Sequence, residues 1–500
     1  MKPEEKKRKI SDEEKKKISR RKKKREEDIK NSKMKNKETT LIMEFFVLLF
    51  LILSVYLIYF KIFEADLVVD NTYNKRIDEL SNSMVRGKIL SKNGAVLAQT
   101  NIEDGEEVRE YPYDNMFCHV VGINSNGKSG LESKCNYALL SNQDTLFDEL
   151  SNDLTGKKPI GNNVVTTLDE NVQEAAYNAM SYKYGAVIAM EADTGNILAM
   201  VSKPDFNPNY AIEKYTEWAE YESNESVLLN RATQGLYPPG STFKILTTLE
   251  YIRENNYDVN SFNYECSGGI QIPQGEFLSC FDGRVHGSQN LMSSFANSCN
   301  GAFATIGSSL DISKFKRTCK SMLFNSNFNS DIEHAQSNFA LTENSSMVEV
   351  METSIGQGKT QITPLHNLVI AATIANGGTA VKPKLIGSIE TSTGKKVRTA
   401  SVERIGELMT ENEASILEAN MRSVITDGVA SDLTWAPYTV YGKTGSAQFD
   451  SSENHHSWFV GFADIDGKRI AISVIVEGGR DSFINATSVA RQVFDACYNN

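Results

Sequence analysis

A serine and a lysine stand three positions apart in the stretch YPPGSTFK, which runs from Tyr237 to Lys244. A serine hydroxyl is a weak nucleophile unless a neighbouring base removes its proton, and a neutral lysine amine can be that base. Ser241 and Lys244 therefore have the residue types of a nucleophile and its base. The pair alone is better explained by an N-cap serine followed by a surface lysine, because serine is common at helix N-caps.

The residues around this pair predict how it is positioned. Two prolines and Gly240 precede Ser241, and they favour a stiff, sharp turn at that point. Apolar residues then recur at helical spacing, at Phe243, Leu246, Leu249 and Ile252. We expect a helix that begins near Ser241, with Lys244 nearly one turn later on the same side.

Two further motifs carry hydroxyl, amide and ammonium groups. Ser298-Cys299-Asn300 spells S-x-N, and Lys443-Thr444-Gly445-Ser446 spells K-T-G-S. The apolar pattern predicts one buried helix over residues 291–310 and a strand around the K-T-G-S motif. We expect the three motifs to converge in one cleft.

The charge of the chain is unevenly distributed. Residues 1–40 contain 18 Lys and Arg against 9 Asp and Glu, while the other 460 residues carry a net charge of −20. The basic segment lacks an apolar face, so disorder is favoured there and no nucleic-acid-binding domain is predicted.

Residues 41–63 form an apolar stretch, and roughly 20 residues suffice to span a bilayer. A cleaved signal peptide is the alternative, but the long polar segment that precedes the stretch favours a retained anchor. Because Lys and Arg lie before the span, the N-terminus is expected to be cytoplasmic and the remainder extracytoplasmic.

Seven cysteines occur in the chain, and Cys118 with Cys135 and Cys266 with Cys280 are close enough in sequence to suggest local disulfides. Cys299 is expected in the core. The Cys and His spacings match no zinc motif, so the sequence predicts no metal site, and no cofactor is expected.

The remaining patterns predict an α+β architecture. Turn signals at residues 92–94 and 126–127 indicate a loop-rich module. β-Hairpin patterns over residues 185–203 and 457–479, the latter preceded by a strand pattern over 437–448, flank helical segments, which predicts an antiparallel sheet covered by helices. The predicted domains are a basic tail (1–40), a transmembrane anchor (41–63), a pedestal (64–165) and a catalytic domain (166–500). Within the last, helices are expected to begin after Thr363, after Thr410 and near Asn485.

The three motifs, in this order, resemble those of the penicillin-recognising serine acyltransferases. Further segments resemble landmarks of class B penicillin-binding proteins, of the penicillin-binding protein A type. They are VRGKILSKNGAVLAQT (85–100), GKSGLE (127–132), TTLDENVQEAA (166–176), GAVIAMEADTGNILAMVSKPDFNPN (185–209) and SIGQGKTQITP (354–364). The resemblance implies the penicillin-binding transpeptidase fold, preceded by a small pedestal domain and one transmembrane helix.

The resemblance also implies a peptidoglycan D,D-transpeptidase. Ser241 would attack the carbonyl between the last two D-alanines of a stem peptide, release D-alanine, and pass the acyl group to the amine of a neighbouring stem. Lys244 would act as base, with partial burial and Lys443 lowering its pKa. Ser298 would relay a proton, and Asn300 would hold Lys244 and the substrate amide.

Substrate contacts are implied for the K-T-G-S strand. Lys443 and Thr444 suit the terminal carboxylate of the substrate, and Gly445 would let the peptide lie close to the strand. The backbone N–H groups of Ser241 and Ser446 would form the oxyanion hole. β-Lactams are the implied covalent inhibitors, and a multi-spanning membrane glycosyltransferase of the shape-and-division type is the implied partner.

Three alternatives accompany this interpretation. A class A serine β-lactamase would need an E-x-x-x-N box, which does not occur between Ser298 and Lys443. A D,D-carboxypeptidase, which passes the acyl group to water, is compatible with the motifs. A non-catalytic cell-wall scaffold that binds through residues 64–165 is disfavoured by the intact Ser241 and Lys244.

Overall fold

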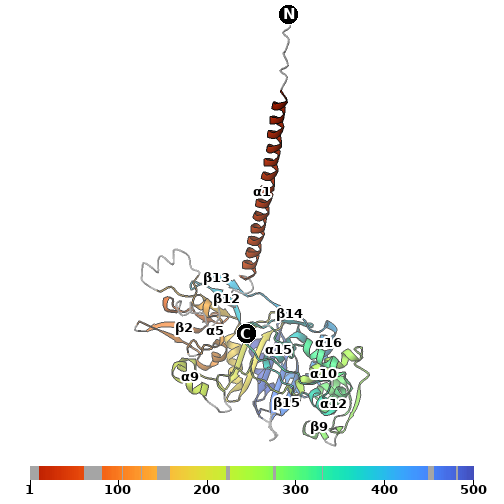
Figure 1. Cartoon of the computed structure of the whole chain (residues 1–500). Helices are drawn as coiled ribbons and strands as arrows, with labels where there is room; N and C mark the ends of the chain where they lie inside the picture. Colours follow the sequence, from red (N-terminus) through yellow and green to blue (C-terminus); the bar gives the residue numbers. More distant parts are fainter. Residues whose placement is uncertain are drawn as a thin grey trace. The chain divides into compact units, whose positions relative to one another are not determined.

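The computed structural model describes residues 11–60, 81–103, 105–125, 127–142, 158–220, 226–273, 277–328, 330–448, 455–479 and 482–499. The chain divides into two compact units, residues 1–74 and 75–500 (Figure 1). Asn126, part of a predicted turn, and residues 61–63, the end of the predicted anchor, lie outside the described residues.

The first unit contains one long helix, α1 (Asp12–Tyr59). Its N-cap is Ser11, whose hydroxyl accepts a hydrogen bond from the Glu14 backbone N–H at 3.4 Å. The prediction of a disordered basic tail is wrong over these residues, because Lys, Arg and Glu are good helix formers and neither Gly nor Pro interrupts the segment. Among the described helices, α1 is the one long and apolar enough to cross a membrane.

The second unit contains a six-stranded sheet with the order β13-β12-β4-β1-β2-β3. Its strands are β1 (Ile89–Leu90), β2 (Val96–Glu103), β3 (Glu106–Glu110), β4 (Asn163–Thr166), β12 (Ile386–Glu390) and β13 (Lys396–Thr399). Strand β1 pairs antiparallel with β2 and parallel with β4, and β12 pairs antiparallel with β4. Strands β12 and β13, which lie far along the chain, therefore complete a sheet whose other strands come from residues 81–166. We call residues 81–166 the N-terminal module. The domain boundaries drawn from the sequence remain predictions.

A buried carboxylate holds this module together. The Glu132 side chain is fully buried and accepts hydrogen bonds from Arg86 Nε at 2.6 Å and Arg109 Nε at 2.7 Å. Burial alone would raise the pKa of Glu132, but the two guanidinium groups hold this pKa below its ordinary value. The helices of the module are η2 (Asp114–Phe117), α4 (Cys118–Val121), α5 (Gly130–Lys134) and α6 (Asn136–Leu139).

A five-stranded antiparallel sheet forms the centre of the unit, with the order β15-β16-β17-β5-β6. Its strands are β5 (Gly185–Glu191), β6 (Ile197–Lys203), β15 (Thr439–Gln448), β16 (His455–Ile465) and β17 (Lys468–Val476). Every residue of β5 and β6 is buried, so both faces of these strands are covered.

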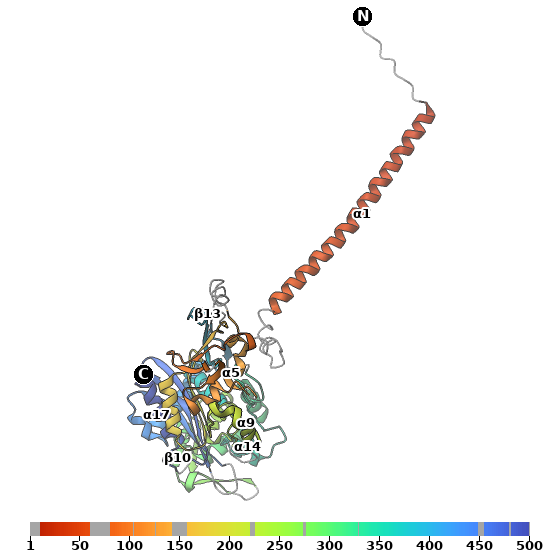
Figure 2. The same ribbon diagram turned by 90° about the vertical axis from the view of Figure 1, so that its left-hand side faces the viewer.

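Two pairs of helices pack against this sheet (Figures 1 and 2). One pair is α8 (Glu170–Met180) with α17 (Ala486–Tyr498), and the other is α15 (Pro364–Ala375) with α16 (Glu411–Thr426). The predicted fold class, an antiparallel sheet covered by helices, is confirmed, as are both hairpins, the N-caps at Thr363 and Thr410 and the closing helix near Asn485.

The remaining elements of the unit connect these layers. They are η3 (Pro208–Tyr210), α9 (Ala211–Glu220), η4 (Gly240–Phe243), α10 (Lys244–Glu254), β7 (Asn263–Cys266), β8 (Gly269–Gln271), β9 (Phe277–Ser279), η6 (Phe281–Gly283), β10 (Gly287–Asn290), α11 (Leu291–Ala296), α12 (Asn300–Ser309), α13 (Ile312–Ser321), α14 (Met347–Ser354), β11 (Thr379–Val381), β14 (Arg404–Glu407) and η7 (Ser431–Trp435).

The single helix predicted over residues 291–310 is wrong, because the chain forms α11 and α12 with a break between them. Ser298 lies in the break with a φ of +55°, a conformation that few serines adopt. Both helices are mostly buried, so the apolar pattern runs through the break and hides it.

Candidate active site

The Ser241 turn is held against strand β15. Ser241 lies in η4, the 3₁₀ turn that leads into α10. Gly240 has a φ of +54°, and a Cβ on this residue would come within 2.7 Å of the Ser446 carbonyl oxygen. Only glycine therefore allows so close an approach between the turn and the strand.

Two hydrogen bonds hold this turn in place. The Trp458 indole N–H donates to the Pro238 carbonyl oxygen at 3.1 Å, and the Gly240 N–H donates to the Gly356 carbonyl oxygen at 2.9 Å. Trp458 was not predicted as part of the site, because no sequence motif marks it. Gly356 lies in the SIGQGKTQITP segment, whose glycines were the available signal.

Two buried lysines meet at one serine hydroxyl. Lys244 Nζ donates to the Ser298 carbonyl oxygen at 2.8 Å, to Ser298 Oγ at 3.2 Å and to Asn300 Oδ1 at 2.7 Å. Lys443 Nζ donates to the same Ser298 Oγ at 2.9 Å and to the Thr444 carbonyl oxygen at 3.2 Å. Both lysines are 0% exposed, and within the described chain neither forms an ion pair with a carboxylate. Four predicted site residues from three distant segments thus lie in contact.

Burial makes these ammonium groups unstable. It lowers the pKa of Lys244 to about 7, while the neighbouring Cys299 and Cys280, when ionised, act in the opposite direction. Burial, together with the charge of Lys244, holds the pKa of Lys443 well below its ordinary value. The predicted role of burial in lowering the pKa of Lys244 is confirmed, whereas the predicted contribution of Lys443 is not among the causes of this shift.

The aromatic surroundings of the lysines come from the two helices that flank Ser298. Lys244 Nζ lies 5.4 Å from the ring centroid of Phe303, and Lys443 Nζ lies 5.6 Å from that of Phe295. These contacts partly offset the loss of hydration of each ammonium group. The break between α11 and α12 therefore places one ring beside each lysine.

The other predicted site residues lie on β15. Thr444 and Ser446 are half-buried and alternate with the buried Lys443, Gly445 and Ala447, so they share one face of the strand. A Cβ on Gly445 would lie 3.1 Å from the side chains of both Thr242 and Trp458. A side chain at position 445 would therefore crowd both Trp458 and Thr242 of the Ser241 turn.

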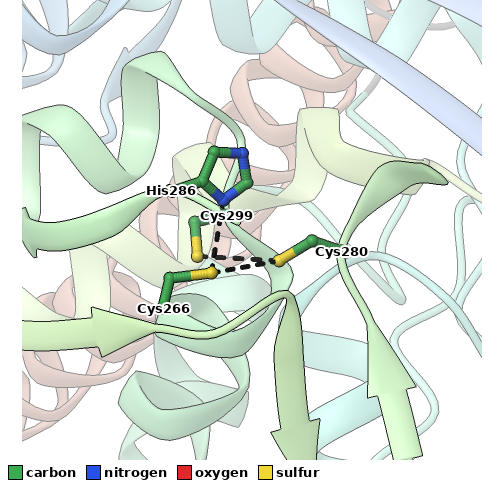
Figure 3. A group of neighbouring side chains, drawn as sticks. All are labelled: Cys266, Cys280, His286 and Cys299. Atoms are coloured by element: carbon green, nitrogen blue, oxygen red, sulfur yellow. Dashed lines mark hydrogen bonds between the residues drawn. The ribbon is translucent and has the colours of Figure 1, made fainter. Parts of the chain in front are cut away.

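Ser241 itself is half-buried, and its hydroxyl makes no hydrogen bond within the described chain. Ser241 lies in the turn that leads into α10, whose first residue is Lys244, but no hydrogen bond joins the two side chains among the described residues. One group that could hold a metal ion borders the site through Cys299, namely Cys266, Cys280, His286 and Cys299 (Figure 3).

Comparison with known proteins gives two family matches. The model for the penicillin binding protein transpeptidase domain matches residues 185–495. The model for the penicillin binding protein A dimerisation domain matches residues 86–164.

Curated relatives and solved structures agree with these matches. The peptidoglycan D,D-transpeptidase PbpA of Mycobacterium tuberculosis is 30% identical over 455 residues, covering 84% of this chain and 89% of the relative. The peptidoglycan D,D-transpeptidase MrdA of Acinetobacter baumannii is 28% identical over 446 residues, covering 77% of this chain and 65% of the relative. The imipenem acyl-enzyme complex of penicillin-binding protein A from M. tuberculosis superposes with a TM-score of 0.74 at 28% identity, covering 83% of this chain and 99% of that one.

Proposed function

Because this chain belongs to the penicillin-binding protein transpeptidase family, we propose that it is a peptidoglycan D,D-transpeptidase that works through a serine acyl-enzyme. The observation that carries the proposal is the meeting of Lys244 and Lys443 at Ser298 Oγ, beside the turn that presents Ser241. A lysine with a pKa of about 7 is neutral often enough to remove the serine proton at physiological pH.

The reaction proceeds in two steps. Lys244 takes the proton of Ser241, whose oxygen attacks the carbonyl between the two terminal D-alanines of a stem peptide. Ser298, hydrogen-bonded to both lysines, passes its proton to the leaving D-alanine nitrogen and takes the proton held by Lys244 in its place. The amine of a second stem peptide then attacks the acyl-enzyme, which forms the cross-link and regenerates Ser241.

Substrate binding falls to the residues around this centre. Asn300 accepts a hydrogen bond from Lys244 and orients it. Lys443 and Thr444 bind the terminal carboxylate of the stem peptide, and the strand at Gly445 aligns the peptide. The backbone N–H groups of Ser241 and Ser446 stabilise the oxyanion, a contribution of about 3 kcal/mol per donor in other enzymes.

β-Lactams acylate the same serine, and a labelled penicillin tests the assignment. The full-length protein is expected to hold the label on Ser241, as identified by peptide mapping, and Ser241→Ala is expected to abolish labelling with an unchanged melting temperature. Ser431→Ala, which alters a serine outside the three motifs, is the matched control and should label normally. Persistent labelling of the Ser241→Ala variant would show that another residue is the nucleophile.

The lifetime of the label distinguishes the alternatives. A transpeptidase holds the acyl group for long periods, a β-lactamase releases it rapidly, and a scaffold never acquires it. Incubation with stem peptides separates transpeptidase from carboxypeptidase, because only the former yields cross-linked dimers.

Membrane orientation and partnership belong to the same proposal. The N-terminus is cytoplasmic and the catalytic unit extracytoplasmic, since Lys and Arg are concentrated in the first 40 residues. Protease added to intact spheroplasts should digest the second unit, residues 75–500. Protection of this unit from the protease would show that the orientation is the opposite one.

A multi-spanning membrane glycosyltransferase of the shape-and-division type supplies the glycan strands. Co-purification from detergent-solubilised membranes is the expected result, and failure to associate with or stimulate any such enzyme would contradict the partnership.

A further inference from the structure

Four side chains with metal-binding atoms gather beside the S-x-N motif. The Sγ atoms of Cys266, Cys280 and Cys299 and a ring nitrogen of His286 all lie within 4.8 Å of one another (Figure 3). Cys266 and Cys280 are each 1% exposed, Cys299 is 0% exposed, and His286 is partly buried. The cluster therefore excludes most solvent, as a closed structural metal site does.

The spacing of these atoms fits a tetrahedron around zinc. Zn–S bonds of about 2.3 Å and Zn–N bonds of about 2.0 Å place two sulfurs about 3.8 Å apart, and a sulfur and a nitrogen about 3.5 Å apart. The Sγ atom of Cys280 lies 3.7 Å from that of Cys266 and 3.8 Å from that of Cys299. Cys266 Sγ lies 3.4 Å from His286 Nδ1. Three of the edges thus have the lengths that zinc requires.

The predicted local disulfides do not form in this structure. A disulfide bond is about 2.05 Å long, and none joins any of the seven cysteines, all of which lie within the described residues. The predicted Cys266–Cys280 and Cys118–Cys135 bridges are therefore absent from this structure.

We propose that Cys266, Cys280, His286 and Cys299 bind one zinc ion, which fixes the strands β7 to β10 to the S-x-N motif. Three thiolates and one imidazole in a tetrahedral arrangement favour zinc over harder cations such as Mg²⁺ or Ca²⁺. The proposal departs from the sequence-based expectation of no metal site. The sequence carries no recognisable zinc motif here, because the ligands are spread over 34 residues without a paired C-x-x-C knuckle.

The segment that supplies three of the ligands has little core of its own. It consists of two ribbons, β7 with β10 and β8 with β9. In β7 the one buried residue is Cys266, in β10 it is Gln289, and β9 has none. Small units that bury little apolar surface commonly depend on a metal or a disulfide for stability.

The fourth ligand connects the metal to the catalytic motif. Cys299 is the N-cap of α12 and stands between Ser298 and Asn300. Asn300 Nδ2 also donates to the Ser279 carbonyl oxygen at 3.0 Å, next to the ligand Cys280. The positive φ of Ser298 costs free energy and persists only where the surroundings hold it. Cys299 is thus a positioning residue for both Ser298 and Asn300.

Metal content of the full-length protein in detergent tests the proposal directly. Elemental analysis is expected to find one zinc per chain, and Co²⁺ exchanged for it should give the absorption bands of a tetrahedral thiolate site. Cys266→Ser and His286→Ala are expected to lose the metal, while Cys319→Ser, a buried cysteine outside the cluster, should retain it. Metal-free wild-type protein that takes up no added Zn²⁺, or a Cys266–Cys280 disulfide found by peptide mapping, would overturn the proposal.

Removing zinc from the wild-type protein tests the site without any substitution, so this test does not depend on whether the variants fold. A chelator should lower the melting temperature and slow penicillin labelling by about 10–100-fold, and added Zn²⁺ should restore both. The effect on labelling rests on the proposed function, whereas metal content does not. A zinc-loaded protein that never labels would refute the catalytic assignment and leave the metal site standing.

Discussion

Two buried charge clusters in the same unit have opposite charge balances. In the N-terminal module, the carboxylate of Glu132 is enclosed with the guanidinium groups of Arg86 and Arg109. In the candidate active site, Lys244 and Lys443 are enclosed with neutral oxygen acceptors.

Opposite charges fix the protonation of the first cluster, since they hold the pKa of Glu132 down despite its burial. The absence of a compensating carboxylate among the described residues leaves the second cluster free to exchange a proton near neutral pH. Both clusters are thus buried, and they differ in charge balance. The balance of charges decides whether a buried cluster has a structural role or can exchange protons.

Replacement of Lys244 should produce the largest kinetic effect. Lys244→Met removes the base and is expected to slow acylation by labelled penicillin about 10²–10⁴-fold. Because no carboxylate loses its partner, the melting temperature should stay the same or rise. Lys244→Arg is the matched variant, since arginine stays protonated and cannot accept the serine proton. Wild-type acylation by Lys244→Arg would rule out the base role.

Replacement of Glu132 should produce the opposite outcome, with lost stability and little direct effect on chemistry. Glu132→Gln leaves two buried guanidinium groups without a carboxylate and is expected to cost about 3–5 kcal/mol of unfolding free energy. Glu107→Gln, which breaks the more exposed pair with Lys158, is the control and should cost at most about 1 kcal/mol. Denaturant unfolding measures both. Equal losses in the two variants would show that the buried cluster is not specially stabilising.

The pH dependence of the two clusters should also differ. The acylation rate is expected to fall about tenfold per pH unit below about pH 7, because Lys244 is then protonated, and to level off above it. The titratable groups facing Lys244 are Lys443, Cys299 and Cys280. A rate that is flat between pH 5.5 and 8, by labelled-penicillin kinetics, is inconsistent with a pKa of about 7.

Stability should follow the same contrast. The pKa of Glu132 is depressed in the folded state, so its contribution is present above its ordinary pKa of 4.5 and is lost as the pH falls through the folded value. The pKa of Lys244 is lowered from 10.5 to about 7 in the folded state, so enclosing its ammonium group lowers the stability of the fold. This loss of stability becomes smaller as the pH rises from about 7 to 10.5, because the folded protein no longer holds the proton. Melting temperatures across the pH range would reveal both trends, and Lys244→Met should remove only the alkaline one.

The smallest effect is expected at the brace behind the Ser241 turn. Trp458→Phe keeps the ring but removes the N–H that donates to the Pro238 carbonyl oxygen, at a cost of about 1 kcal/mol. Trp435→Phe is the control, because Trp435 is 85% exposed and should be neutral. Thermal unfolding checks the difference, and identical melting temperatures would show that the contact does not stabilise the turn.

Local patterns in the amino-acid sequence determine much of this protein. The hairpin over residues 185–203, the N-caps at Thr363 and Thr410, and the helix after Ser241 follow from periodicity and capping, which act over a few residues. The three motifs likewise identify the residues that meet at Ser298. The spacing of the motifs along the chain, however, does not give the distances between these side chains.

Only the tertiary structure decided the properties that depend on neighbours distant in sequence. The break at Ser298 is invisible to periodicity because both flanking helices are buried. Strand β12 joins the N-terminal sheet through pairing with β4, which no local propensity encodes. The pKa of Lys244 depends on what encloses its ammonium group, and that enclosure exists only when segments far apart in the chain pack together.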